Sequence, residues 1–306
     1  MRTLSLAEYL AWLRMPPEHA ATEVACEVCN EAESVLIRAS VEIEHGLDVD
    51  LRVLACARCG YLFQNPRFDA AFYSAYYEHR YRLVLSGSAG PSDGFMQDQR
   101  SRGEYLYRRL AGLFDAPGRM LDVGCSAGGV MHAFLMRGWT GFGTDPDAGY
   151  VAHGQQHYQA PIALQAAEEM VLEPHSYDLI VITGSLEHVV DPNRVLALCR
   201  LAARPGAVLL LEGRALAQAR QTGRCGHNHR RYLTAKSINL LMRKHAWQPL
   251  SISDEPLCGP TRPHSVFGIG RAGDPLGSAN FDALVRESAG DGADETRGDF
   301  ARWLIR

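Results

Sequence analysis

The chain has 306 residues, 46% of them hydrophobic and 22% charged, with a formal net charge of −4 at pH 7. This size and composition are those of an ordinary soluble protein with one full domain and an appendage. A net negative charge offers no general attraction to phosphate backbones or anionic membranes, so neither nucleic acid nor a membrane is expected as a partner. Without a signal-peptide core or a span-length apolar stretch, the expected location is the cytoplasm.

The N-terminal region begins with a helical pattern and continues with two pairs of cysteines. Apolar residues recur with a helical period over residues 4–15 and stop at two prolines. Two C-x-x-C turns follow, separated by strand-like stretches at residues 35–37 and 51–54. Two such turns supply the four thiolates of a closed tetrahedral zinc site, so we predict a zinc ribbon with a structural metal. The predicted ligands are Cys26, Cys29, Cys56 and Cys59.

A helical linker is expected over residues 66–115. Its first part, residues 66–82, is rich in aromatic residues, and a Gly/Ser/Pro loop at 86–94 precedes a helix at 97–114. Two interpretations of the aromatic stretch stay open. It packs the ribbon against the next domain, or it forms a lid from which Tyr76 or Tyr77 reaches the substrate.

A strand, a glycine-rich turn and a helix are predicted in succession from residue 119. The apolar run of Met120, Leu121 and Val123 is typical of a buried strand, and a helical period starts at Val130. Gly124 and Gly128 permit close approach of the backbone to a ligand, while the helix directs unpaired N–H groups and the positive end of its dipole at the same point. The turn therefore predicts a nucleotide-like ligand.

Strands and helices alternate after this turn, which predicts a doubly wound, Rossmann-like α/β domain with a seven-stranded sheet. Ligands collect at the carboxyl ends of such strands, where Asp145 and Thr183 stand. Asp145 is placed to accept both hydroxyls of a ribose, and its alternative role is that of a helix N-cap. The strands that follow the turn are expected at residues 141–144, 161–164, 177–183, 207–212, 250–253 and 265–269, with a turn at 204–206 before the fourth of them.

Several motifs resemble a known family. The run D-V-G-C-S-A-G at residues 122–128 resembles the first motif of class I S-adenosylmethionine (AdoMet) methyltransferases, and L-E-H-V-V-D-P at 186–192 resembles the motif that follows the fourth strand of small-molecule members. Together with the cysteine pairs and H-N-H-R-R-Y-L-T-A-K-S at 227–237, they look like methyltransferases with an N-terminal zinc-binding domain. The best-known members methylate sugar carbons in antibiotic pathways.

This resemblance implies AdoMet as the cofactor and assigns roles around it. Asp122 lies near the methionine amino group in such enzymes, and the segment that contains Ala167 lies beside the adenine. Asp145 accepts from the ribose. The cofactor residues implied in this way are Asp122, Gly124, Ser126, Gly128, Asp145, Ala167 and Thr183.

The active-site segment departs from the family pattern. Members place a tyrosine and a glutamate before a histidine, whereas Gly226 and Asn228 occupy those positions here, before His229. Because removal of a proton from carbon needs a well-supported base, O- or N-methylation of a small-molecule acceptor, a sugar or natural-product intermediate, is favoured over C-methylation. We expect His229 to be the general base and His188 to orient the acceptor. The substrate candidates are Tyr76, Tyr77, His227 and Asn228.

Two other functions remain open. Gly124, Ser126 and Gly129, with Asp145 beyond them, also imitate the fingerprint of an NAD-dependent oxidoreductase. A non-catalytic interaction protein that binds AdoMet would retain the same residues. The predicted domains are a helix and ribbon at 1–65, a linker or lid at 66–115, the methyltransferase domain at 116–272 and a tail at 273–306 with one short helix at 300–305. The ribbon and the methyltransferase domain are expected to have separate cores, and the oligomeric state is open.

Overall fold

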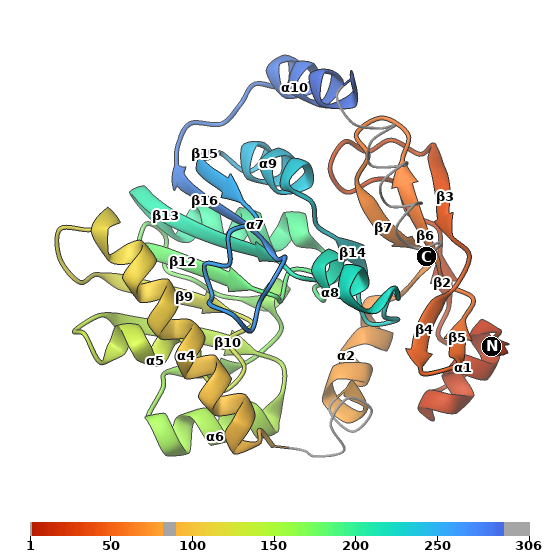
Figure 1. Ribbon diagram of the computed structural model, residues 1–306, viewed down its shortest axis with the longest axis horizontal. Coiled ribbons are helices and arrows are strands. Elements are labelled where there is room, and N and C mark those ends of the chain that lie inside the picture. The colour runs from red at the N-terminus through yellow and green to blue at the C-terminus, as the bar shows by residue number, and fades with distance from the viewer. Residues whose placement is uncertain (1, 82–89, 291–306) are drawn as a thin grey trace.

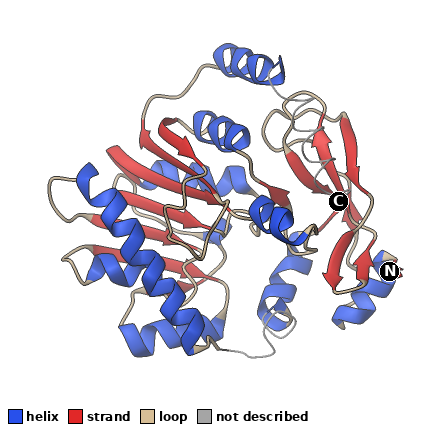
Figure 2. Ribbon diagram, viewed as in Figure 1, coloured by secondary structure: helices blue, strands red, loops and turns tan. Residues whose placement is uncertain are grey.

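The computed structural model describes residues 2–81 and 90–290, so the short helix predicted at 300–305 lies outside the described residues. A large sheet with helices around it stands beside a smaller, β-rich N-terminal part (Figure 1). Figure 2 shows the strands gathered into these two groups. Within the described ranges, no helix combines the length and apolar character needed to cross a membrane.

The large sheet has seven strands, as predicted, and their order is β11-β10-β9-β12-β13-β16-β15. β16 runs antiparallel to both of its neighbours, and the other pairs are parallel. The order places β9 and β12 next to each other at the centre, where the chain reverses its direction of winding. The strands are β9 (Arg119–Val123), β10 (Thr140–Asp145), β11 (Ile162–Leu164), β12 (Tyr177–Thr183), β13 (Ala203–Gly213), β15 (Trp247–Ser253) and β16 (Val266–Ala272).

Two layers of helices cover the sheet because successive side chains of each buried strand point to opposite faces. In β12, Leu179 and Val181 pack on one face, and Ile180 and Ile182 pack on the other. Figure 1 shows α4, α5 and α6 on the first face and α7 and α9 on the second. These helices are α4 (Asp93–Leu110), α5 (Gly129–Leu135), α6 (Ala148–Tyr158), α7 (Pro192–Ala202) and α9 (Ala235–Lys244).

One predicted turn lies inside a strand. β13 begins at Ala203 and contains residues 204–206, because Ala203 pairs with Tyr177 before the register shifts and pairing resumes between Val208 and Leu179. Gly206, with a φ of 76°, takes the left-handed conformation within this irregular stretch.

The N-terminal part contains three further sheets, the smallest of which pairs β2 with β8, and one of them is closed by a strand from a distant part of the chain. Its four-stranded sheet has the order β14-β7-β6-β3, and the three-stranded sheet has the order β1-β5-β4. β14 (Arg231–Tyr232) follows the methyltransferase strand β13 in sequence, yet it pairs with β7 through Arg231 and Phe63. The other elements are β1 (Arg2–Leu4), α1 (Leu6–Leu13), β2 (Ala21–Thr22), β3 (Ser34–Arg38), β4 (Val41–Glu44), β5 (Leu47–Val49), β6 (Arg52–Cys56), β7 (Leu62–Asn65), β8 (Arg67–Phe68) and α2 (Ala70–His79).

The expectation of separate cores is wrong. One continuous hydrophobic cluster contains Cys26, Val28 and Tyr61 of the ribbon together with Leu241 and Trp247 of the methyltransferase part. The cysteine turns pack against α9 and its surroundings, so the two parts bury apolar surface jointly.

A helix also extends this joint core where no helix was predicted. α10 (Ser278–Gly290) lies in the tail, where we predicted only a short helix at 300–305, and its Val285 is fully buried in the shared cluster. Phe281 and Leu284 pack against the same cluster. The i, i+3, i+4 spacing of these three residues is the sequence signal that could have revealed it.

Candidate functional site

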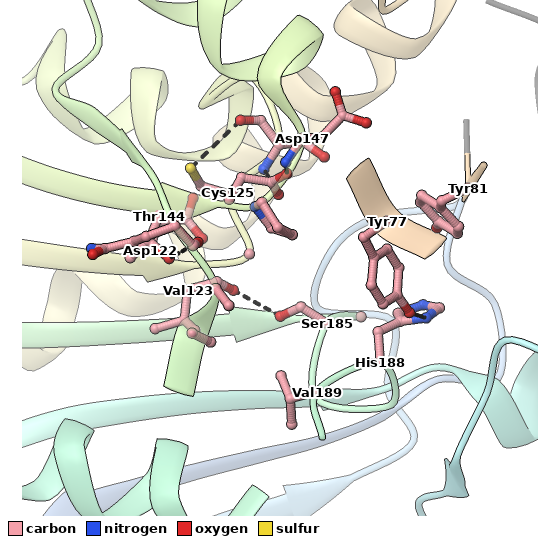
Figure 3. Close-up of a pocket in the computed structure, with 18 of the residues that line it drawn as sticks. Tyr77, Tyr81, Asp122, Val123, Cys125, Thr144, Asp147, Ser185, His188 and Val189 are labelled. Carbon is pink, nitrogen blue, oxygen red and sulfur yellow. Dashed lines mark hydrogen bonds between the residues drawn. The ribbon is translucent and has the colours of Figure 1, made fainter. Parts of the chain in front are cut away.

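A cavity of about 530 Å³ opens at the carboxyl ends of β9, β10 and β12. This volume suits a small-molecule ligand. Tyr73 and Tyr77 of α2 form part of its wall, so the linker helix closes the cavity on one side. Figure 3 shows Asp122, Thr144 and Asp147 on one side of the cavity and Tyr77 and His188 on the other. Of the residues predicted for the site, the lining contains Asp122, Gly124, Ser126, Asp145, Ala167, Thr183, Tyr77 and His188.

The glycine turn is held tightly against the loop that follows β12. Gly124 has a φ of 70°, and a Cβ at this position would lie 2.4 Å from the Cβ of Ser185. The Ser185 hydroxyl donates to the Val123 carbonyl at 2.7 Å. Only glycine therefore fits at position 124, and its backbone faces the cavity.

Asp145 ties the turn to the next helix. Its Oδ2 accepts from the backbone N–H of Ser126 at 2.8 Å, and its Oδ1 accepts from that of Asp147 at 3.0 Å. The N-cap of α6 is Asp147, which accepts from the Tyr150 N–H at 3.0 Å. The alternative N-cap role for Asp145 is therefore wrong, and its carboxylate stands at the cavity wall.

Asp122 lines the cavity and has a buried carboxyl oxygen. Among the described residues, Asp122 Oδ2 has no hydrogen-bond partner. Burial raises the pKa of Asp122 to about 7. The nearby positive charge of Arg102 acts to lower this pKa, and the negative charge of Asp145 acts to raise it. A buried carboxyl oxygen without a partner fits a cationic ligand group such as an ammonium, which would lower this pKa again.

The remaining cofactor candidates take different places. Ala167 begins a short 3₁₀ helix (Ala167–Glu169) at the cavity wall, and Thr183 ends β12 there. Gly128 does not line the cavity. It is the N-cap of α5 with a φ of 74°, and a Cβ there would contact Ile162 and Ala160, so its role is in packing.

His188 is the histidine that reaches the cavity. Its Nδ1 lies 3.1 Å from the Asn228 carbonyl oxygen and 3.1 Å from the Tyr77 hydroxyl. Because a carbonyl oxygen only accepts, the contact to Asn228 requires the proton on Nδ1 and leaves Nε2 as a proton acceptor. Burial, with the neighbouring His229 and Arg230, holds the pKa of His188 well below its usual value, so the ring is neutral at pH 7.

The other histidines of this segment lie behind His188. The His229 ring centroid is 4.9 Å from that of His188, and burial, with Arg214 and His227, lowers the pKa of His229 to about 3. His227 lies deeper, with its Nδ1 2.5 Å from the Tyr9 hydroxyl. Tyr76 packs against the His227 ring in the N-terminal core. His229, His227, Asn228 and Tyr76 therefore lie outside the cavity lining, although each is within one or two contacts of it.

A buried arginine that we did not predict holds the loop that carries His188. The fully buried Arg231 donates from one terminal nitrogen to the Leu186 carbonyl and, at 2.8 Å, to the Val189 carbonyl. Glu187, also buried, accepts from the backbone N–H groups of Arg214 and Ala215 at the start of α8 (Ala215–Thr222). These contacts fix the loop on both sides of His188.

The same arginine joins this loop to the first cysteine turn. Arg231 donates to both carboxylate oxygens of Glu27, at 2.8 and 3.1 Å, and Arg67 donates to the same two oxygens at 2.5 and 3.1 Å. Glu27 stands between Cys26 and Cys29. Burial favours a raised pKa for Glu27, but the two guanidinium groups outweigh it and hold the pKa well below its usual value.

The four cysteines meet as predicted. The Sγ atoms of Cys26 and Cys59 are 3.5 Å apart, as are those of Cys29 and Cys56, and all four lie within 4.8 Å of one another. Tetrahedral zinc with bonds of about 2.3 Å separates its sulfur ligands by roughly 3.8 Å. The cluster fits a structural zinc ion, with all positions filled by sulfur.

The sheet, the glycine turn and the buried Asp122 at the carboxyl end of β9 define a methyltransferase-like domain. A family model described as a methyltransferase domain matches residues 97–252, or 156 of the 306 residues. The chain belongs to this methyltransferase family. The match favours methyl transfer over the NAD-dependent alternative.

Relatives in sequence and structure are similar over parts of the chain. The ubiquinone biosynthesis O-methyltransferase of Pseudomonas savastanoi pv. phaseolicola is 35% identical over 97 residues, which are 29% of this chain and 40% of the relative. The chain thus spans less than half the length of such relatives. A methyltransferase from Methanosarcina mazei aligns over 55% of this chain and 98% of its own, with 15% identity and a TM-score of 0.48. A didemethyltoxoflavin N1-methyltransferase from Burkholderia thailandensis aligns over 67% and 87%, with 19% identity and a TM-score of 0.46.

Proposed function

We propose that the protein transfers the methyl group of AdoMet to an oxygen or nitrogen atom of a small-molecule acceptor. The observation that carries this proposal is the placement of a buried, unpartnered carboxyl oxygen of Asp122 and a neutral histidine, His188, in one cavity. The first suits the cofactor's ammonium group, and the second suits removal of a proton from an acceptor.

The cofactor end of the cavity would bind AdoMet through groups already in place. Asp122 would hold the methionine ammonium, and the Asp145 carboxylate would accept from the ribose hydroxyls. Gly124 lets the backbone approach the ligand, and Ala167 stands where the adenine is expected. AdoMet supplies an electrophilic methyl group on a sulfonium, which a nucleophile attacks in line.

The acceptor end supports proton removal by His188. With its Nδ1 proton directed at the Asn228 carbonyl, Nε2 has the lone pair that takes the acceptor's proton. We had expected His229 to be the base, but it lies behind His188, where it contacts the ring and supports its orientation. We therefore exchange the two roles. Tyr77, hydrogen-bonded to His188, is the tyrosine placed to touch the acceptor.

Oxygen or nitrogen is favoured over carbon as the atom that receives the methyl group. Position 228 is an asparagine, so it supplies no carboxylate to support the histidine that acts as base. The curated relatives are named as O-methyltransferases, which agrees with oxygen as the acceptor atom. A sugar or natural-product intermediate remains our proposed acceptor.

The test is a screen of phenol, sugar and amine acceptors with methyl-labelled AdoMet, together with calorimetric titration of S-adenosylhomocysteine and NAD. We expect S-adenosylhomocysteine to bind and at least one acceptor to be methylated. With that acceptor, His188→Asn should lower turnover by roughly 10² to 10⁴ while the cofactor affinity stays unchanged. His157→Asn, an exposed histidine on α6, is the control. Binding without any transfer would indicate the non-catalytic alternative, and binding of NAD alone would indicate the oxidoreductase.

A further inference from the structure

Three arginines stand among the described residues that line the cavity, and they differ in their partners. Arg102 donates to Glu212 at 3.2 Å, and Arg262 lies 3.6 Å from an Asp98 oxygen and 3.9 Å from Glu212. For the exposed Arg214, the described part of the chain supplies no carboxylate and no side-chain hydrogen bond. Among the described lining residues, its guanidinium group is therefore the positive charge that is available to a ligand.

Arg214 is fixed close to the acceptor end of the cavity. It follows β13, and its backbone N–H donates to Glu187, the residue before His188. Its Cδ would lie 3.5 Å from a Cβ on Gly184, which lines the cavity directly after β12. The charge of Arg214 is also one of the causes that lower the pKa of His188. The side chain thus extends along the loop on which His188 stands.

A second arginine without a hydrogen-bond partner lies behind the aromatic wall of the same cavity. Arg230 is 1% exposed, and within residues 2–81 and 90–290 none of its three guanidinium nitrogens has a hydrogen-bond partner. Its Cζ lies 3.1 Å from the ring centroid of Tyr73 and 5.8 Å from that of Tyr77, and both tyrosines line the cavity. Buried positive charge without a carboxylate raises the potential on this wall, because screening is weak in a protein interior. Glu78, the carboxylate on this wall, is exposed, so solvent screens its charge.

We propose that the methyl acceptor carries an anionic oxygen group, a carboxylate or a phosphate, which binds the Arg214 guanidinium while the nucleophile faces His188. This inference rests on the proposed function and narrows its substrate class. Guanidinium binds such groups with two parallel hydrogen bonds, which fixes orientation as well as charge. Arg230 adds to the favourable potential without touching the ligand.

The experiment measures binding to the protein saturated with S-adenosylhomocysteine, by calorimetry. The probes are benzoate, 4-hydroxybenzoate and 3,4-dihydroxybenzoate, each with its matched amide, and phenyl phosphate with phenol. The variants are Arg214→Gln, Arg214→Lys and, as the matched control, Arg220→Gln, an exposed arginine on the helix α8 that follows Arg214. The carboxylate and phosphate arms distinguish the two kinds of anion.

We expect the wild type to prefer at least one anion over its neutral partner by about tenfold. Arg214→Gln should abolish this preference, Arg214→Lys should retain part of it, and Arg220→Gln should leave it unchanged. No anion preference in the wild type, or a preference that survives in Arg214→Gln, would overturn the proposal. So would a variant Arg214→Gln that loses affinity for S-adenosylhomocysteine, because the arginine would then hold the cofactor's own carboxylate. Failure of the wild type to bind S-adenosylhomocysteine at all would instead overturn the proposed function on which this one rests.

Discussion

The two ends of the cavity are held in place by different means. At the cofactor end, the turn after β9 is fixed by Asp145 and by the tight contact of Gly124 with Ser185, all short contacts of backbone and small side chains. At the acceptor end, the buried guanidinium of Arg231 donates hydrogen bonds to the loop that carries His188. The same guanidinium is paired with Glu27 of the zinc ribbon.

This difference indicates which substitutions should disturb each end of the cavity. The cofactor end depends on short contacts between neighbouring strands of one sheet and the turns that follow them. The acceptor end depends on a charged network that joins three distant segments, and a buried charge that loses its partner costs far more than a lost surface contact. We expect substitutions in the ribbon to disturb the loop that carries His188. Substitutions in the glycine turn should affect only the cofactor end.

The largest effect is expected from loss of the metal. Wild-type protein should contain about one zinc per chain, and Cys26→Ser combined with Cys59→Ser should remove it, as elemental analysis will show. Because structural zinc contributes on the order of 10 kcal/mol in zinc-finger peptides and the core here is shared, unfolding should weaken throughout the molecule. Circular dichroism on heating should show this, while Cys258→Ser keeps its zinc. Zinc-free wild type would contradict the prediction.

A smaller effect should follow when the network loses one charge. Glu27→Gln leaves the Arg231 and Arg67 guanidinium groups buried without a carboxylate, which should cost about 3–5 kcal/mol of unfolding free energy. Urea denaturation measures it. The control is Arg204→Gln, which breaks the partly exposed pair with Asp178 and should cost about 1 kcal/mol. Equal costs for the two variants would show that the acceptor end is no more dependent on charge than the surface is.

At the cofactor end, Asp145→Ala should weaken S-adenosylhomocysteine binding by roughly ten- to a hundredfold, or about 1.5–3 kcal/mol, because the ribose hydroxyls lose a charged acceptor. Asp147→Ala removes the α6 N-cap and should lower stability by about 1 kcal/mol. The affinity of Asp147→Ala for S-adenosylhomocysteine should change less than that of Asp145→Ala. Calorimetry and thermal unfolding of the two variants separate the roles, and unchanged affinity in Asp145→Ala would refute the ribose assignment.

Counted per histidine and per pH unit, the smallest effect comes from the buried histidines of the acceptor end. Burial lowers the pKa of His227 to about 4 and that of His229 to about 3, against an ordinary value of 6.5. Their contribution to stability is complete above pH 6.5. It declines as the pH falls toward 4, because the unfolded chain takes up the protons that the folded chain refuses. Each histidine should contribute about 1.4 kcal/mol per pH unit.

Urea denaturation between pH 7 and 4.5 measures this slope, and His229→Gln should reduce it by the share of one histidine. The same slope in the variant and the wild type would mean that His229 is protonated as readily in the folded protein as in the unfolded chain.

The parts that could be predicted are those built from contiguous residues. The strands around Asp122, the glycine turn and the four cysteines each depend on patterns a few residues long, and all were found. The role of Arg231 could not be predicted, because its partners come from residues 27 and 186–190 and nothing local marks them. We predicted His229 as the base from its position in the family motif. In the fold, however, His229 lies behind His188, and no local sequence pattern indicates which of the two lines the cavity. α10 has a helical spacing of apolar residues at positions 281, 284 and 285, which our prediction of the tail missed.

The strand β14 sets the unit in which this protein can be recombined. Because it leaves the methyltransferase chain to complete the ribbon sheet, and because Arg231 within it needs Glu27, a chimera that exchanges residues 1–65 alone would place a foreign sheet edge against β14. The exchangeable unit consists of the ribbon, residues 186–190 and residues 226–232 together. A designer who transplants the first segment without the other two would bury a charge with no counterpart beside the acceptor site.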